Sequence, residues 1–233
     1  MPNFPIPGPN SVSWIRCEAD EVDEMISETA ATFAARDLPF LWVIDPGTKP
    51  ADLVARLAEH GYGPDPHGEE ASVMVLPINS AIEAPRVEGL ELHDALADPA
   101  TFTAADTAAA EAFLSVHLAD DPERLAMLER RRVDAVAAGN RRVLLATVDG
   151  EPAGSASLAL FPPHAAMING GSVRPKFRGQ GVYRALVAAR LEMAREAEVA
   201  GLVVQAGAMS KPILDRLGFK PVTWRRFYVH RPL

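Results

Sequence analysis

The sequence predicts a mixed α/β (α+β) fold in two unequal parts, a smaller N-terminal α/β subdomain over residues 11–80 and a larger domain over residues 90–233. Segments with helical spacing of apolar residues alternate along the chain with short apolar runs that are bounded by turn residues. Residues 142–161 show the pattern of a β-hairpin, so part of the sheet is expected to be antiparallel. Residues 77–89 lack clear periodicity and are predicted to connect the two parts.

The N-terminal part is predicted to alternate helices and strands. Residues 18–35 have helical spacing, and residues 39–44 form an apolar run that ends in a turn, as a buried strand does. Thr48 is expected to cap a second helix that ends at Gly61. A further strand is predicted over residues 71–76.

The elements of the larger part are marked by residues that favour particular ends and turns. Asp121 followed by Pro122 is typical of a helix N-terminus, and Asp149-Gly150 is typical of a two-residue hairpin turn. In chain order we expect a strand over 90–93, a helix over 100–118, a helix opened by Asp121, strands over 142–148, 153–161 and 165–173, a helix over 179–197, a strand over 201–205, a short helix over 210–217 and one or two strands over 219–230.

Composition and charge argue against several classes of function. The chain has 233 residues, with 23 basic and 31 acidic residues and a net charge of −8, which suits neither nucleic acid nor an anionic membrane. No apolar run approaches the roughly 18 residues of a spanning helix, and residues 1–10 lack the basic segment of a signal peptide. Cys17 is the only cysteine, which excludes an intrachain disulfide and favours a cytoplasmic setting. No cluster of histidine and cysteine indicates a metal site.

The segment that carries chemical information is 173–186, where a strand ends, a basic loop follows and a long helix begins. The first amides of a helix have no partner within it, and the helix dipole is positive there. Gly179 and Gly181 lack a Cβ, so a phosphate can approach the backbone closely. These features predict a diphosphate site, with positive charge added by Arg174, Lys176, Arg178 and Arg184.

Two familiar phosphate loops do not fit this segment. A P-loop needs Gly-Lys-Ser/Thr, which is absent, and Arg184 stands where a dinucleotide-binding loop has its third glycine. A bare Gly-x-Gly would favour an ordinary strand-to-helix turn. The preceding Val-x-Pro, the pair Phe177-Arg178 and the amphipathic helix that follows favour cofactor binding instead.

Residues 173–186 resemble the acetyl-CoA signature of the GNAT superfamily of N-acetyltransferases, in which Arg/Gln-x-x-Gly-x-Gly/Ala follows a strand that ends in Val-x-Pro. Arg178, Gly179, Gln180 and Gly181 match, whereas Tyr183 replaces the final small residue. The resemblance covers roughly residues 90–230 and implies a GNAT-like mixed, mostly antiparallel sheet flanked by helices, with acetyl-CoA as cosubstrate. It implies cofactor contacts at Ser172, Val173, Arg178, Gly179, Gln180, Gly181, Val182, Tyr183 and Arg184.

The resemblance also implies how the cofactor is held. The strand 165–173 is expected to splay from the strand 201–205, so that its free edge pairs with pantetheine. Gly170-Gly171 stands where such a strand would bulge or admit another backbone. An amide near Ser172 or Val173 is expected to polarise the thioester oxygen.

The N-terminal part contains a weak echo of the C-terminal part. Thr48-Lys49-Pro50 before Gly61-Tyr62 is similar to Ser210-Lys211-Pro212 before Gly218-Phe219. One interpretation is a degenerate GNAT-like half. The other is that strand-turn-helix-Gly is common in any α/β protein.

The residues that would perform acid–base chemistry are less clear. The carboxylate and the tyrosine that the family often supplies are replaced by Asn169 and Leu214, and its usual asparagine by Gly207. Ser210 and Tyr183 are weak candidates, because a helix N-cap explains Ser210 better and packing against the cofactor explains Tyr183 better. Glu111 and His117 lie on a helix that borders the acceptor cleft in the resembling fold, but solvated surface positions explain them better. His164 lies near the right region, but a loop histidine needs no function.

These observations lead to one preferred function and two rivals. The preferred function is transfer of an acetyl group from acetyl-CoA to the amine of a small molecule, with a protein amine as a less favoured acceptor. The rivals are a non-catalytic acyl-CoA-binding module and a nucleotide-binding interaction domain of another fold. No nucleic acid or membrane partner is expected, and a homodimer is an expectation from the resemblance alone.

Overall fold

The computed structural model describes residues 8, 10–114 and 121–230. The chain forms two compact units, Met1–Met74 with Gln205–Leu233, and Val75–Val204. The first boundary between these units, after Met74, falls within the strand β4 (Glu70–Pro77). Residues 205–233, which the sequence places with the larger domain, are thus grouped with the N-terminal residues.

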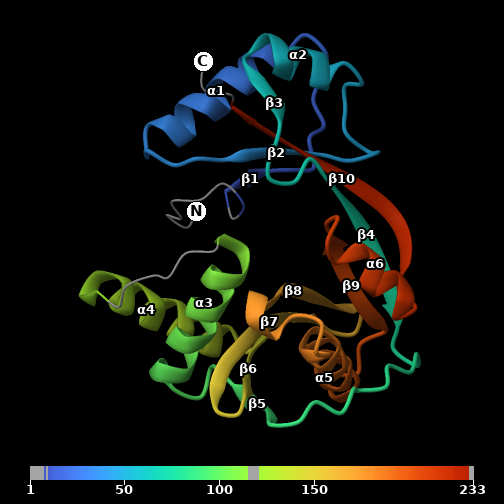
Figure 1. Cartoon of the computed structure of the whole chain (residues 1–233). Coiled ribbons are helices and arrows are strands. Elements are labelled where there is room, and N and C mark those ends of the chain that lie inside the picture. The colour runs from blue at the N-terminus through green and yellow to red at the C-terminus, as the bar shows by residue number, and fades with distance from the viewer. Residues whose placement is uncertain (1–7, 9, 115–120, 231–233) are drawn as a thin grey trace. The chain divides into compact units, whose positions relative to one another are not determined.

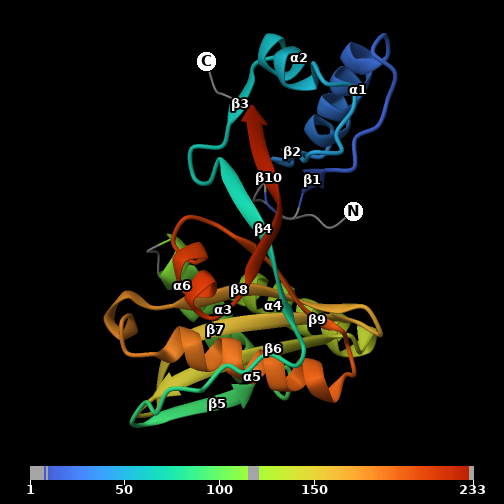
Figure 2. The ribbon, with the colours of Figure 1, turned by 90° about the vertical axis from the view of Figure 1, so that its right-hand side faces the viewer.

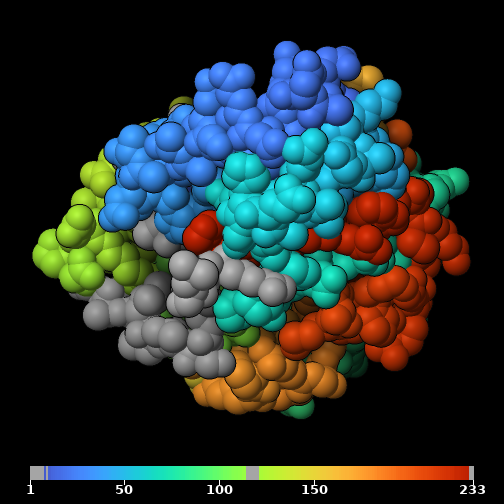
Figure 3. Space-filling model, turned by 90° about the horizontal axis from the view of Figure 1, so that it is seen from above, coloured from blue at the N-terminus to red at the C-terminus, as the bar shows by residue number. Residues whose placement is uncertain are grey.

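The first unit is a small sheet with helices packed on it. β1 (Ser11–Val12) runs parallel to β2 (Leu41–Ile44), and β10 (Lys220–His230) is antiparallel to both β2 and β3 (Tyr62–Pro64). The helices α1 (Val22–Ala34) and α2 (Leu53–Glu59) form an outer layer of this unit (Figures 1 and 3), and α6 (Lys211–Arg216) follows later in the chain. Its core contains the fully buried residues Val22, Trp42 and Leu57.

Thr48 does not cap the second helix, so that prediction is wrong. Its hydroxyl instead accepts a hydrogen bond from the amide of Asp45 at 3.0 Å, while the Asp45 carboxylate accepts one from the amide of Gly47 at 2.9 Å. The polar side chains are therefore used to close the turn, and α2 begins later, at Leu53.

The second unit is a mostly antiparallel sheet with helices on both faces. The sheet order is β5 (Leu90–Asp94), β6 (Arg141–Val148), β7 (Glu151–Phe161), β8 (Ala165–Val173) and β9 (Gly201–Ala206), and only β8 and β9 are parallel. Figure 2 shows α5 (Val182–Glu196) on one face and α3 (Pro99–Leu114) with α4 (Pro122–Ala138) on the other. The last four residues of the predicted helix 100–118 lie outside the described residues.

Local sequence signals correctly predict several ends and turns of this unit. Asp149 and Gly150 both adopt positive φ, 50° and 77°, and they join β6 to β7 in the register Val148 opposite Glu151. Asp121 accepts a hydrogen bond from the amide of Arg124 at 2.9 Å, with Pro122 in the first turn of α4. The mixed α/β fold, with its mostly antiparallel sheet flanked by helices, is therefore confirmed.

Within the described part of the chain, no helix combines the length and apolar character needed to cross a membrane.

Candidate functional site

The loop between β8 and α5 is built from a short 3-10 turn and two glycines. In the turn Pro175–Phe177, the amides of Phe177 and Arg178 donate to the carbonyls of Arg174 and Pro175. Gly179 and Gly181 then adopt positive φ, 77° and 96°, a region that side chains with a Cβ rarely enter. Gly181 is the N-cap residue of α5, and no side chain of the described residues caps this helix.

The amides at the start of α5 are free to bind an anion. Within the described residues, the amides of 179–184 donate no hydrogen bond, and the first amide to do so is that of Ala185, to the Gly181 carbonyl at 3.0 Å. These donors lie at the positive end of the helix dipole. The arrangement is the one by which helix N-termini bind phosphate.

The two glycines differ in their surroundings. A Cβ on Gly181 would lie 3.0 Å from Cγ of Pro85 and 3.2 Å from Cγ2 of Val87, both in the connector that precedes β5. A Cβ on Gly179 would have no neighbour within 4 Å among the described residues. Gly181 is therefore required by the local packing, whereas the described residues leave space beside Gly179.

The basic side chains of the loop already have partners within the protein. Arg174 Nη1 lies 2.9 Å from a Glu151 carboxylate oxygen, and Lys176 contacts the same carboxylate. Arg178 donates to backbone carbonyls, and Arg184 lies 3.8 Å from a Glu83 carboxylate oxygen. The backbone amides, more than these cations, are thus the groups available to an anion.

Arg178 and Gln180, two of the predicted cofactor contacts, hold the loop itself. Arg178 donates from Nε to the Val173 carbonyl at 3.0 Å and from Nη2 to the Ala112 carbonyl of α3 at 2.9 Å. The Gln180 side-chain amide donates to the Lys176 carbonyl at 3.0 Å. Direct contact of either side chain with a cofactor stays a prediction.

Beyond Met167, one edge of β8 has no partner strand among the described residues. β8 pairs with β7 along most of its length but with β9 only at Ala166–Leu202 and Met167–Val203. This early end of the parallel pairing agrees with the predicted splay. A strand edge of this kind offers main-chain donors and acceptors to an extended ligand.

The predicted bulge is present in β8. Ser157 pairs with Asn169 and Ser155 with Ser172, so Gly170 and Gly171 together face a single residue of β7. A bulge of this kind bends the strand and redirects the residues that follow it.

The backbone N–H and C=O of Val173, rather than those of Ser172, point to the edge of β8 that has no partner strand in the described part of the chain. The Arg174 amide donates to the Ala153 carbonyl of β7 at 2.9 Å, and backbone groups alternate between the two edges of a strand. The Val173 carbonyl accordingly bonds to Arg178 on the other edge, and the Val173 amide points the same way. Ser172 is paired toward β7, and its hydroxyl donates to the Ser155 carbonyl at 3.4 Å.

Tyr183 packs under the bulge. Its ring carbon Cε2 would lie 3.1 Å from a Cβ on Gly171, and the Arg190 guanidinium nitrogen Nη2 would lie at the same distance. Burial raises the pKa of the Tyr183 phenol, and the charge of Arg190 partly opposes this shift. The phenol is therefore protonated at neutral pH.

The other candidate catalytic residues include one that is engaged in an ion pair and one that is exposed in a loop. Ser210 stands at the N-cap of α6 without a capping hydrogen bond, and its hydroxyl donates to the Gly207 carbonyl at 3.4 Å, so the N-cap explanation is not supported by its contacts. Glu111 forms an ion pair with Arg174. His164 is exposed in the loop before β8, and His117 lies outside the described residues.

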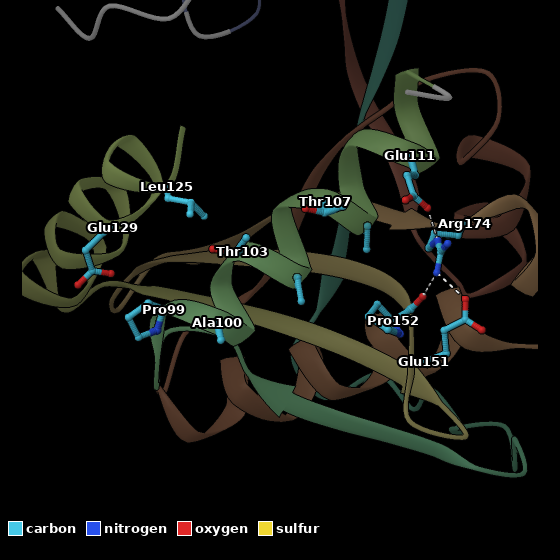
Figure 4. A pocket seen from close by; sticks show the side chains of 12 residues that line it. Pro99, Ala100, Thr103, Thr107, Glu111, Leu125, Glu129, Glu151, Pro152 and Arg174 are labelled. Atoms are coloured by element: carbon cyan, nitrogen blue, oxygen red, sulfur yellow. Dashed lines mark hydrogen bonds and ion pairs between the residues drawn. The ribbon is translucent and has the colours of Figure 1, made fainter. Parts of the chain in front are cut away.

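A groove of about 850 Å³ lies beside α3 (Figure 4). Small side chains of α3 line one wall, Leu125 and Glu129 of α4 face them, and Arg174 and Glu151 lie at one end. At this end, Arg174 donates a hydrogen bond from Nη1 to the Pro152 carbonyl at 2.7 Å. The lining is mostly small or apolar and includes the carboxylates of Glu111, Glu129 and Glu151.

Sequence reasoning assigned no role to Arg190, which proves to be buried beneath the bulge. The available signal was its place in the apolar stripe of the helix, where it follows Leu186 by one turn. A charged residue on a core-facing stripe indicates a specific task for that charge.

Comparisons with solved structures identify this architecture as an N-acetyltransferase fold. A GCN5-related N-acetyltransferase from Kribbella flavida is 17% identical with a TM-score of 0.66, over 93% of this chain and 77% of that chain. A tandem GNAT protein from the clavulanic acid biosynthesis pathway is 18% identical with a TM-score of 0.65, over 94% and 72%. A GCN5-related N-acetyltransferase from Sphaerobacter thermophilus is 19% identical with a TM-score of 0.63, over 90% and 67%. At these identities the similarity concerns the fold.

The family model for the acetyltransferase (GNAT) family matches residues 104–219. Through these residues the chain belongs to the GNAT family, as the loop at 173–186 predicts. A comparison with curated proteins found no match. The interpretation of the N-terminal part as a degenerate GNAT-like half stays a prediction.

Proposed function

We propose that this protein is an acyl-CoA-dependent N-acetyltransferase that moves the acetyl group of acetyl-CoA to the amine of a small molecule. The observation that carries the proposal is the row of amides at 179–184, which have no acceptor in the described part of the chain, directly after a glycine loop. Membership of the GNAT family through residues 104–219 supports the same reaction class.

The residues present fit acetyl-CoA. The amides at 179–184 would bind its diphosphate, and the free edge of β8 would pair with pantetheine. When bound, acetyl-CoA supplies an activated acetyl thioester. The Val173 amide, which faces the free edge, is the donor best oriented to stabilise negative charge on the thioester oxygen.

Proton transfer involves no dedicated carboxylate in this proposal. The amine must be neutral when it attacks, and the leaving thiolate must gain a proton. Asn169 does not titrate, so we propose that water removes the proton from the amine. Tyr183 is the better of the two acid candidates, because its buried phenol stays protonated at neutral pH, and Tyr183→Phe tests this role through the rate of thiol release.

The groove beside α3 supports a small acceptor. A cavity of about 850 Å³ suits a small molecule, for which cavities of roughly 300–1,000 Å³ are typical. The carboxylates of Glu111, Glu129 and Glu151 lie along it, although each has a basic partner within the protein. A cationic amine with an apolar body is therefore the acceptor class that we expect. A cytoplasmic location and a homodimer stay predictions from the sequence.

A screen for thiol release from acetyl-CoA against a panel of small amines tests this function. We expect CoA to raise the melting temperature and at least one amine to accelerate thiol release. The alternative, a non-catalytic acyl-CoA-binding module, is favoured by Asn169 and Leu214, which replace the family's usual acid–base residues. Stabilisation by CoA without acceleration by any amine would support that alternative, whereas stabilisation by ATP and not by CoA would contradict both.

A further inference from the structure

Arg190 is a buried charge with no countercharge among the described residues. It lies on the sheet-facing side of α5 and is 1% exposed, and no other charged residue in the described part of the chain is as buried. Burial lowers the pKa of its guanidinium to about 10, and Tyr183 acts in the opposite direction. No ion pair with a carboxylate compensates it among the described residues. A buried cation of this kind is costly, so a specific structural use is expected.

The guanidinium binds backbone carbonyls on two adjacent strands. Nε donates to the Leu186 carbonyl of its own helix at 2.9 Å, which fixes the direction of the side chain. Nη1 donates to the carbonyls of Ser157 in β7 and Asn169 in β8, each at 3.3 Å. Ser157 and Asn169 form the last regular pair before the bulge. Arg190 thus ties α5 to the point where β8 leaves the regular ladder.

The bulge and the arginine fit each other sterically. A Cβ on Gly171 would lie 3.1 Å from Arg190 Nη2 and 3.5 Å from Nη1, so only glycine leaves full room for the guanidinium. Nη2 is buried and has no hydrogen-bond partner within the described residues. Gly171 and Arg190 therefore form one unit beneath the strand that leads to Val173.

We infer that Arg190 is a positioning residue that fixes the bulge of β8 and, through it, the direction of the Val173 amide toward the thioester oxygen. The inference rests on the proposed function, because it assigns a task within the same site. A bulge left without this support would still be a bulge, but the two residues beyond it would have more freedom of direction. An oxyanion donor loses its effect when its direction varies, because its catalytic value depends on being preorganised.

The carbonyl stretch of bound [1-13C]acetyl-CoA, measured by isotope-edited infrared spectroscopy, tests this inference without an acceptor. A directed hydrogen bond lowers the stretching frequency of the thioester carbonyl. We expect the wild-type protein to lower it relative to free acetyl-CoA. Arg190→Met, which keeps a long side chain but removes the donors, should lose most of this shift while its Kd for CoA changes less than about threefold. Arg190→Lys, which retains a cation and a donor, should recover part of the shift.

Arg195→Met is the matched control. Arg195 lies on the same helix and also donates to backbone carbonyls, including that of Ile78 at 3.1 Å, but these belong to the connector and not to β8. This variant should show the wild-type frequency.

The outcomes separate this inference from the proposed function. Failure of the wild-type protein to bind CoA would overturn both. Normal CoA binding with an unchanged carbonyl frequency in Arg190→Met would overturn the positioning role alone. Loss of CoA binding in Arg190→Met would also overturn it, because Arg190 would then support the whole cofactor site. Should Arg190→Met fail to fold, the carbonyl frequency is measured in Arg190→Ala and Arg190→Lys instead. A wild-type frequency in Arg190→Ala would then refute the positioning role.

Discussion

The anion site at the start of α5 is tested most directly by placing a negative charge beside the free amides. Gly179 is the better position for this change, because a Cβ there has no neighbour within 4 Å in the part of the chain that the structure describes. Gly181 is unsuitable, since a Cβ would lie 3.0 Å from Pro85 and φ is 96°. We therefore choose Gly179→Asp, with Gly179→Asn as the matched control, because both side chains have the same size and tolerate the positive φ of 77° comparatively well.

The expected loss of affinity follows from Coulomb's law. A carboxylate on residue 179 would lie roughly 6 Å from a phosphate held by the neighbouring amides, and at an effective dielectric constant of about 20 the repulsion is about 2.8 kcal/mol. This corresponds to a roughly 100-fold higher Kd for CoA. The asparagine variant should share any backbone strain but not this repulsion.

Isothermal titration of CoA into the wild-type protein and both variants measures the effect. The ratio of Kd values between the aspartate and asparagine variants should fall as salt rises from about 0.05 to 0.5 M, because exposed charges are then screened. Equal affinities for the aspartate and asparagine variants at low salt would refute the assignment of the diphosphate to this helix start.

Four further substitutions test the packing and charges around the site. Arg178→Met should lower the free energy of unfolding by about 1 kcal/mol in urea, because two hydrogen bonds to backbone carbonyls are lost; lower CoA affinity at unchanged stability would instead indicate cofactor contact. Glu151→Gln should lower the melting temperature at pH 7 but not in acid. Lys176 and then Arg174 hold the pKa of the Glu151 carboxyl below its usual value. The stabilisation by this carboxylate is therefore complete above the usual pKa and is lost as the pH falls through the lowered pKa. Leu186→Ala removes a fully buried side chain and should cost about 2–5 kcal/mol by denaturant unfolding, against less than about 0.5 for Val133→Ala at a 49% exposed position. Ser210→Ala should change the free energy of unfolding by less than about 0.5 kcal/mol, since no capping hydrogen bond is lost, and a loss of about 1 kcal/mol would restore the capping role.

Features determined by local sequence were predictable. The Asp149-Gly150 turn and the Asp121-Pro122 helix start follow from the backbone preferences of adjacent residues, and both are present. The glycine loop before α5 was predictable for the same reason. The bulge at Gly170-Gly171 was also expected, although there the resemblance to a family contributed as much as the residues themselves.

Features determined by distant residues were not predictable. The sequence suggests that Arg174 and Arg178 supply charge to an anion, but partners far along the chain, such as Glu111 and Ala112, engage them. The short strand β1 has too few residues to produce a periodic pattern, and it exists because β2 lies beside it. The role of Arg190 likewise depends on two strands that precede its helix.

The strand β10 has a consequence for the order in which the protein acquires its structure during synthesis. It pairs with β2 and β3, so the first unit lacks an internal strand until residues 220–230 have left the ribosome. Residues 75–204 are all translated before that point. Residues 75–204, which carry the glycine loop, can therefore fold first, whereas the core of the first unit is completed only after residues 220–230 have been translated.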